Sequence, residues 1–150
     1  MKKNILISIA LIMSLGVSAK RYPSIEINHL PIEAQNFILH NFGASSIKKV
    51  KESSNKYEVK LDDGTKIQFF KNGSLKQAEA GKHYSLPISV LNVLPRNVKA
   101  YVMQNFGKWR LIEVEVKNSG KIEIELEKGK YDAELEFNHA GQLIKVDVDD

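Results

Sequence analysis

The stretch LPIEAQNFILHNFG at residues 30–43 returns as LPRNVKAYVMQNFG at residues 94–107, with a constant offset of 64 positions. Leu-Pro opens both copies, and Asn-Phe-Gly closes them. The match resumes further along the chain, with small insertions, at Val59 and Ile124, Leu61 and Leu126, Gly64 and Gly129, Gly73 and Gly141, and Leu75 and Leu143. Ordered coincidences of this kind indicate a duplicated supersecondary unit.

Each copy is predicted to begin with a helix. Proline fits the first helical position, because an N–H group there would have no partner within the helix. Apolar residues follow at spacings of three and four, which places them on one helical face. They are Ala34, Phe37, Ile38 and Phe42 in the first copy, and Val98, Tyr101, Val102 and Phe106 in the second. Gly43 and Gly107 stand where a left-handed C-terminal cap is expected.

Four strands are predicted to follow each helix. Residues 56–61 alternate between polar and apolar side chains, as a strand with one buried face does. Asp63-Gly64 and Asn72-Gly73 predict tight turns. In the second copy the alternation covers residues 112–116, 122–126, 131–137 and 144–148. The predicted fold class is therefore α+β: two tandem repeats, each a helix followed by a four-stranded antiparallel meander, with the helices on one face of the sheet.

The predicted units cover residues 22–80 and 86–150. Residues 80–83 form the expected linker, and a brief helix is expected between Leu86 and Val93. A unit of about 60 residues is marginal for independent stability. We therefore expect the two units to pack together and to leave the face opposite the helices open to solvent.

The first 19 residues have the features of a secretory signal peptide. Two lysines precede the apolar run Ile5–Leu15, which is too short to span a bilayer as a mature helix. Small residues at 17–19 favour cleavage after Ala19; a retained N-terminal anchor is the alternative. We expect a periplasmic or secreted protein without a membrane span after cleavage. The absence of cysteine excludes disulfides and a lipoprotein anchor, and favours a bacterial envelope.

The pattern resembles the PepSY-like, beta-lactamase-inhibitor-like family of exported bacterial proteins. The residues that carry the resemblance are the two Leu-Pro helix starts, the two Asn-Phe helix ends, Tyr57-Glu58-Val59, Leu61, Asp63-Gly64, Ile67, Phe69, Asn72-Gly73, Leu86-Pro87 and Tyr101-Val102. The resemblance implies a tandem fold similar to the beta-lactamase inhibitory protein, with a sheet surface free to bind a partner. It brings no catalytic residues, and it implies inhibition or regulation of envelope peptidases.

Charge is segregated along the chain. Residues 44–80 contain eight lysines and five acids, whereas residues 110–150 contain six basic and eleven acidic side chains. This arrangement either keeps an exposed sheet soluble or steers a complementary partner. The overall balance of 22 basic to 18 acidic residues is not that of a nucleic-acid-binding domain. The candidate partner-binding residues are Lys56, Lys60, Lys66, Glu113, Glu115, Glu123, Glu125, Glu134 and Glu136, with Lys48 on the same basic face.

Trp109 has two interpretations. It is predicted to pack between the second helix and the sheet; exposed, it would be a candidate hot spot for binding.

No catalytic, cofactor or metal site is expected. The four histidines, at positions 29, 40, 83 and 139, are scattered, and the chain has neither Gly-x-Ser-x-Gly nor His-Glu-x-x-His. Glutamates at every second position indicate an exposed sheet face rather than the carboxylate pair of a glycosidase. Asp147-Val148-Asp149-Asp150 lacks the glycine and the distant glutamate of a calcium loop, so a solvated acidic end is expected.

These features favour an exported, non-enzymatic binding protein of the bacterial envelope. Its partner is expected to be an envelope protein, with a peptidase as one candidate, and not a nucleic acid. A small-ligand or ion-binding periplasmic protein that uses the crevice between the two units is the alternative, because pockets favour such junctions. An enzyme is the least supported class.

Overall fold

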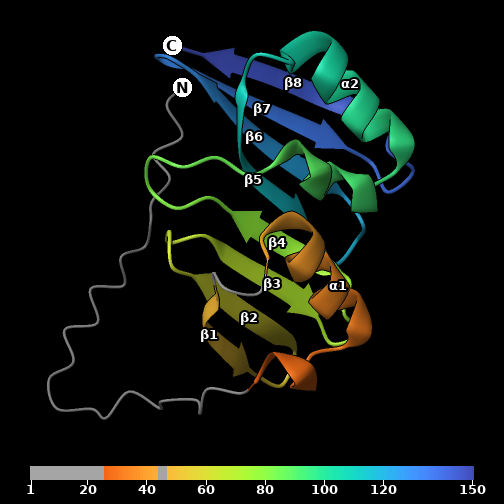
Figure 1. The fold of residues 1–150 in the computed structure, drawn as a ribbon. Coiled ribbons are helices and arrows are strands. Elements are labelled where there is room, and N and C mark those ends of the chain that lie inside the picture. The colour runs from red at the N-terminus through yellow and green to blue at the C-terminus, as the bar shows by residue number, and fades with distance from the viewer. Residues whose placement is uncertain (1–25, 44–46) are drawn as a thin grey trace, which may run out of the picture.

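A computed structural model describes residues 26–43 and 47–150 (Figure 1). The predicted signal peptide and its cleavage site lie outside the described residues. In chain order the elements are η1 (Ile27–His29), α1 (Ile32–Asn41), β1 (Ile47–Glu52), β2 (Lys56–Leu61), β3 (Lys66–Phe70), β4 (Leu75–Glu79), η3 (Ile88–Val93), α2 (Arg96–Phe106), β5 (Arg110–Val116), β6 (Ile122–Lys128), β7 (Tyr131–Phe137) and β8 (Leu143–Asp149). No described helix has the length and hydrophobicity to cross a membrane.

The eight strands form one antiparallel sheet in the order β1 to β8, as Figure 1 shows. This confirms the predicted fold class of two helix-plus-four-strand units. The units join edge to edge, because β4 pairs with β5 through Gln77 opposite Glu115, Ala78 opposite Val114 and Glu79 opposite Glu113. The two predicted meanders are therefore halves of a single sheet.

Both helices cover the same face of the sheet (Figure 1). The predicted helical stripes are confirmed: Ala34, Phe37 and Ile38 are buried on α1, and Val98, Val102 and Phe106 on α2. Equivalent aromatic contacts anchor each helix to the third strand of its own unit. The ring centroids lie 5.6 Å apart for Phe37 and Phe69, and 5.8 Å apart for Tyr101 and Phe137, with edge-to-face geometry in both cases.

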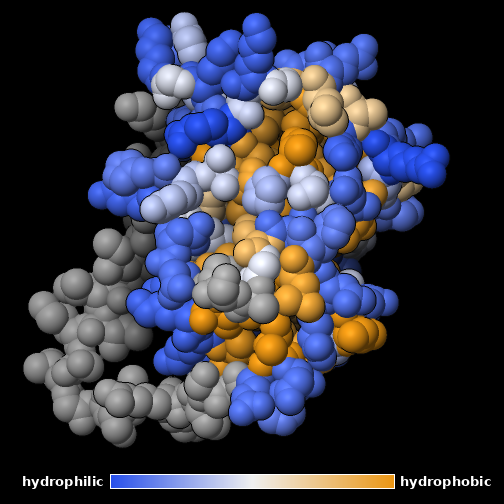
Figure 2. All heavy atoms as spheres, in the orientation of Figure 1, coloured by the Kyte–Doolittle hydropathy of each residue, from blue (hydrophilic) through white to orange (hydrophobic). Residues whose placement is uncertain are grey.

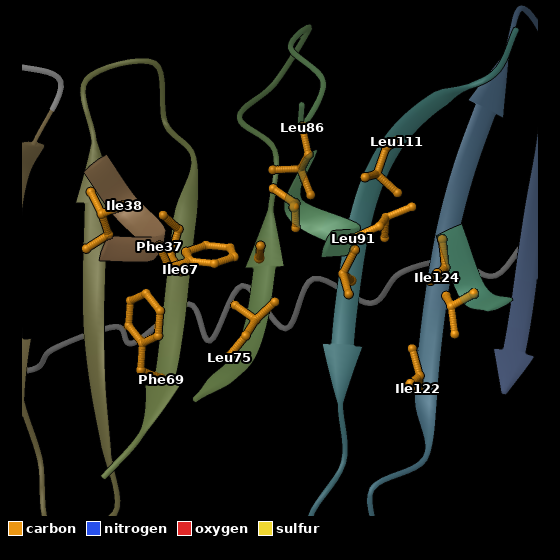
Figure 3. Close-up of a cluster of buried hydrophobic side chains, with 14 of the residues drawn as sticks. Phe37, Ile38, Ile67, Phe69, Leu75, Leu86, Leu91, Leu111, Ile122 and Ile124 are labelled. Atoms are coloured by element: carbon orange, nitrogen blue, oxygen red, sulfur yellow. The ribbon is translucent and has the colours of Figure 1, made fainter. Parts of the chain in front are cut away.

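The core is one continuous layer that passes from the first unit into the second (Figure 3). Cross-strand pairing aligns one core residue from each strand: Val50, Val59, Ile67, Ala78, Val114, Ile124, Leu135 and Val146. All but Val146 are buried. Above the junction, η3 buries Val90 and Leu91, while Leu86 bridges to Leu111. Figure 2 shows the helix side, where hydrophobic residues reach the surface between hydrophilic rims.

A glycine turn in each unit touches the proline that precedes the helix. A Cβ atom on Gly73 would lie 2.7 Å from the Cβ atom of Pro31, and one on Gly141 would lie 2.6 Å from the Cβ atom of Pro95. Both glycines have positive φ, +92° and +82°. Glycine is therefore required at these turns both for conformation and for space.

Three local expectations are modified. The helices begin one residue after the prolines, which serve as N-caps. Gly43 has the expected left-handed conformation (φ +74°), but Gly107 does not. At φ −62° it continues the right-handed turn, so that the Trp109 N–H donates to the Phe106 carbonyl over 3.0 Å. The final strand forms as predicted, but its apolar side chains remain exposed.

Candidate functional site

The face of the sheet opposite the helices carries the segregated charge. Because successive strand residues point to opposite faces, polar residues that alternate with the core line up across neighbouring strands. Register joins one residue from every strand into a transverse charged row: Lys49, Lys60, Lys66, Glu79, Glu113, Glu125, Glu134 and Asp147. Three lysines are thus followed by five carboxylates across the whole width of the molecule.

An adjacent row is more mixed. It consists of Lys51, Glu58, Gln68, Gln77, Glu115, Glu123, Glu136 and Lys145. Its acids are partly neutralised by two lysines from the β5–β6 turn. The Lys117 Nζ atom lies 3.0 Å from Glu115 Oε1, and the Lys121 Nζ atom lies 3.3 Å from Glu136 Oε2. These hydrogen bonds are the largest cause of the raised pKa values of Lys117 and Lys121.

All nine predicted charged residues share this open face, although sequence reasoning missed Lys49, Glu79 and Asp147 of the charged row. The basic half of this face lies over β1 to β3, and the acidic half lies over β4 to β8. Register places the three predicted lysines on the basic half and the six predicted glutamates on the acidic half. Lys48 falls at a register shift, so that Lys49 enters the row instead. Alternation around Val50 could have indicated Lys49, but Glu79 and Asp147 join the row through pairings that the local pattern does not specify.

Trp109 does not belong to the open face. It is partly buried against the core, and its ring centroid lies 5.2 Å from that of Phe106 with edge-to-face geometry. Trp109 therefore packs against the second helix, as one of the two interpretations expected. Its role as a binding hot spot stays a prediction.

The centre of the charged row contains two carboxyl groups forced together by register. Glu113 and Glu125 are cross-strand neighbours, and both are half-buried. Burial, followed by repulsion from Glu113, raises the pKa of Glu125 to about 7. Burial also raises the pKa of Glu113, against the opposing effect of a hydrogen bond from Gln77 Nε2 to Glu113 Oε1 over 2.5 Å. Near neutral pH this pair can hold a proton between its carboxylates.

The two halves of the open face are each slightly hollowed. A hollow of about 330 Å³ is lined by Lys49, Lys51, Lys60 and Lys66 together with Glu58, Val59 and Ile67. A second, of about 180 Å³, is lined mainly by acids, among them Glu125, Glu134 and Asp147. Glu123, Glu134 and Glu136 each place a carboxylate oxygen within 4.8 Å of the others, and Lys121 contacts two of these three.

The predicted crevice between the units is present on the helix side. A cavity of about 350 Å³ is lined by residues of both units, including Phe37, Leu75, Val93 and Ile122. Glu33 and His139 add ionisable groups to a lining that is otherwise largely apolar. His139 comes from the β7–β8 turn, whereas the other described histidines lie in η1, α1 and the linker.

The fold and its open charged face define a class: tandem α+β proteins with one exposed sheet surface. The chain belongs to the family described as "Putative beta-lactamase-inhibitor-like, PepSY-like", whose model matches residues 17–77 and 56–145. The recognition made from the sequence motifs is confirmed. Among curated proteins, no sequence matches the chain.

Three crystal structures of Bacteroides proteins are similar to this chain. A "putative calcium-regulated periplasmic protein" of Bacteroides thetaiotaomicron has 27% identity and a TM-score of 0.67, with 83% of this chain and 94% of that chain covered. A "putative periplasmic protein" of Bacteroides vulgatus has 25% identity and a TM-score of 0.69, with 87% and 99% covered. A second protein of that species, described as periplasmic and of unknown function, has 26% identity and a TM-score of 0.60, with 81% and 94% covered.

Proposed function

We propose that this chain is an exported, non-enzymatic protein of the bacterial envelope that binds a protein partner on its open sheet face. The charged row is the observation that carries the proposal. Five carboxylates in register on β4 to β8 would steer a basic surface toward the acidic half of the face, and three lysines on β1 to β3 would disfavour its approach to the basic half. The periplasmic descriptions of the similar structures support this compartment, with cleavage after Ala19 as the matching step.

The family description supports an inhibitor as the specific form of this role. An inhibitor of this kind would cover the active-site entrance of an envelope hydrolase, such as a peptidase, whose rim is basic. Its face would supply a fixed surface, since the residues that bind lie on strands of a sheet with a continuous core. Such a partner would lose activity when it is saturated with the protein.

The test is capture of envelope proteins on the immobilised mature protein, followed by mass spectrometry and an affinity measurement. Glu125→Lys/Glu134→Lys reverses the centre of the acidic half and should weaken binding of the captured partner by at least about tenfold. Glu26→Lys/Asp62→Lys makes the same change in net charge at exposed positions away from this face, and should bind as the wild type does. Equal binding by all three proteins would contradict the proposal.

A small-ligand carrier is the second candidate, and the cavity shared by the two units is the observation that favours it. A ligand bound only by the folded protein raises its melting temperature by mass action. The screen includes CaCl₂, because the similar Bacteroides thetaiotaomicron protein is described as calcium-regulated. Val93→Trp narrows the cavity without altering the open face, so a shift retained by this variant would place the ligand elsewhere.

A further inference from the structure

The last strand is an exposed apolar edge. On β8, the side chains of Leu143, Ile144, Val146 and Val148 are between 41% and 57% exposed. Within the described residues, β8 pairs only with β7. The opposite edge, β1, instead has lysines at positions 48, 49 and 51, and lysine is a common means of preventing edge-to-edge pairing. The β1 edge therefore opposes pairing with a strand of another molecule, whereas the β8 edge lacks this protection.

The repeat shows what a strand in the position of β8 does when a neighbour is present. At an offset of 68 residues, Leu143 and Val146 of β8 correspond to Leu75 and Ala78 of β4. β4 pairs with β5 under the shared core layer, and there Leu75 is 7% exposed and Ala78 is fully buried. Their counterparts on β8 lack such a neighbour and are 42% and 41% exposed. Each unit thus ends in a strand of the same type. The first copy, β4, pairs with β5, whereas the second copy, β8, has an unpaired edge within the described residues.

We propose that β8 pairs antiparallel with β8 of a second copy, about a two-fold axis at Val146. In this register Lys145 of each copy lies opposite Asp147 of the other, so that two oppositely charged pairs form by symmetry. On the other face Val146 meets its own counterpart, and Ile144 lies opposite Val148. Directly opposed side chains are close enough for these pairs to stabilise the contact, and like charges there would oppose it. The interface is isologous and therefore stops at a dimer.

Charge disfavours one competing arrangement, and the other does not close on itself. A two-fold axis at Asp147 would bring two aspartates face to face. Pairing of β8 with β1, in the register that joins β4 to β5, would place Lys145 opposite Lys51 and Asp147 opposite Lys49, so that one repulsive and one attractive pair offset each other. That contact is heterologous, so each added copy would present a further unpaired edge at the end of the assembly, which would grow into open chains. The proposed dimer instead keeps the lysine-rich β1 edges outermost and brings the two acidic halves together at the centre.

This self-association goes beyond binding of a partner and does not depend on it. The test is sedimentation velocity of the mature protein over a wide concentration range at physiological ionic strength, where the Debye length of about 8 Å limits repulsion between the acidic halves. We expect a monomer–dimer equilibrium without larger species. Lys145→Asp should weaken the dimer by about tenfold or more, because each aspartate then faces Asp147. Lys145→Asp/Asp147→Lys restores both pairs with opposite polarity and should restore the dimer.

Lys49→Glu/Lys51→Glu provides the control, since it changes the β1 edge and the basic half of the open face, both far from β8 across the sheet, and should leave the dimer unchanged. Circular dichroism and melting temperature establish that each variant is folded. A wild type that stays monomeric at every concentration would overturn the proposal, as would failure of the double exchange to restore a folded dimer. Species that grow beyond the dimer and respond to the β1 variant would overturn it in favour of pairing between β8 and β1.

Discussion

At the scale of single residues, the most informative pair is Glu113 and Glu125. Strand register alone brings them together, and half-burial makes the ionised form of both unfavourable. A carboxylate pair of this kind weakens the folded state wherever both groups are charged. Its position at the centre of the acidic half supports the proposal that this surface binds a partner.

Stability should consequently fall as pH rises through the titration of Glu125. Its folded pKa of about 7 exceeds the ordinary value of 4.5, so the folded state binds the proton more tightly than the unfolded state does. The penalty is absent below about pH 4.5 and complete above about pH 7. Glu125→Gln should therefore stabilise the protein by about 1–2 kcal/mol at pH 8, after allowance for solvent screening, and should have little effect at pH 4.5.

Urea unfolding at the two pH values measures this difference. Glu58→Gln, which removes one carboxylate from the basic half of the same face, is the matched control. An equal gain from Glu125→Gln at both pH values would mean that charge is not the cause.

At the scale of elements, each helix is positioned by its own strand turn. Gly73 contacts Pro31 and Gly141 contacts Pro95, so the same contact between a strand turn and a helix start occurs in both units. The equivalent aromatic contacts, Phe37 with Phe69 and Tyr101 with Phe137, lie on the same helices. This contact explains why glycine occurs at corresponding positions of both copies, because glycine alone fits both a positive φ and a close approach to proline.

Replacing either glycine should therefore be costly. Gly73→Ala and Gly141→Ala should each destabilise the protein by about 1–3 kcal/mol, because the added methyl group meets proline in a backbone conformation that alanine resists. Gly129→Ala is the matched control, since that glycine also has positive φ (+59°) but an added methyl group there would meet no atom within 4 Å. Its cost should be about 1 kcal/mol, due to conformation alone. Chemical denaturation of the three variants would reveal whether contact adds to conformation.

Sequence patterns predicted the elements well and their relations less well. Alternation within 56–61 and the helical stripe around Phe37 depend on neighbours close in sequence, and both were confirmed. Pairing of β4 with β5 was not specified, because an edge strand and an inner strand can share one alternating pattern. The same limit hid the closeness of Glu113 and Glu125, which depends on register. Exposure of Val146 was missed because alternation shows which face a residue occupies, but not whether a neighbouring strand or a helix covers it.

At the scale of the whole molecule, the two repeats share one structure. The core layer crosses the β4–β5 junction, where Ala78 and Val114 are both fully buried. Leu86 and Leu91, from the connection between the units, pack on the same layer (Figure 3). Because neither unit completes its core without the other, the units should unfold together.

A single unfolding transition is expected. Trp109, the one tryptophan of the chain, lies against α2, so its fluorescence reports on unfolding of the second unit. Far-UV circular dichroism reports on the secondary structure of both units. Denaturant curves from the two probes should coincide. Ala78→Asp, which places a charge in the buried junction, should move both curves to lower denaturant concentration by the same amount. Separate midpoints would show that the units are independently stable.

The strand order has a kinetic consequence. Every strand pairs with strands next to it in sequence, so nearly all of the sheet can be built by closing short loops. Topologies of this kind have low contact order and reach their native state quickly for their strand content. The long connection between β4 and β5, which carries η3 and α2, is the main exception. Each meander can therefore form promptly, and docking of that connection is the natural last step of assembly.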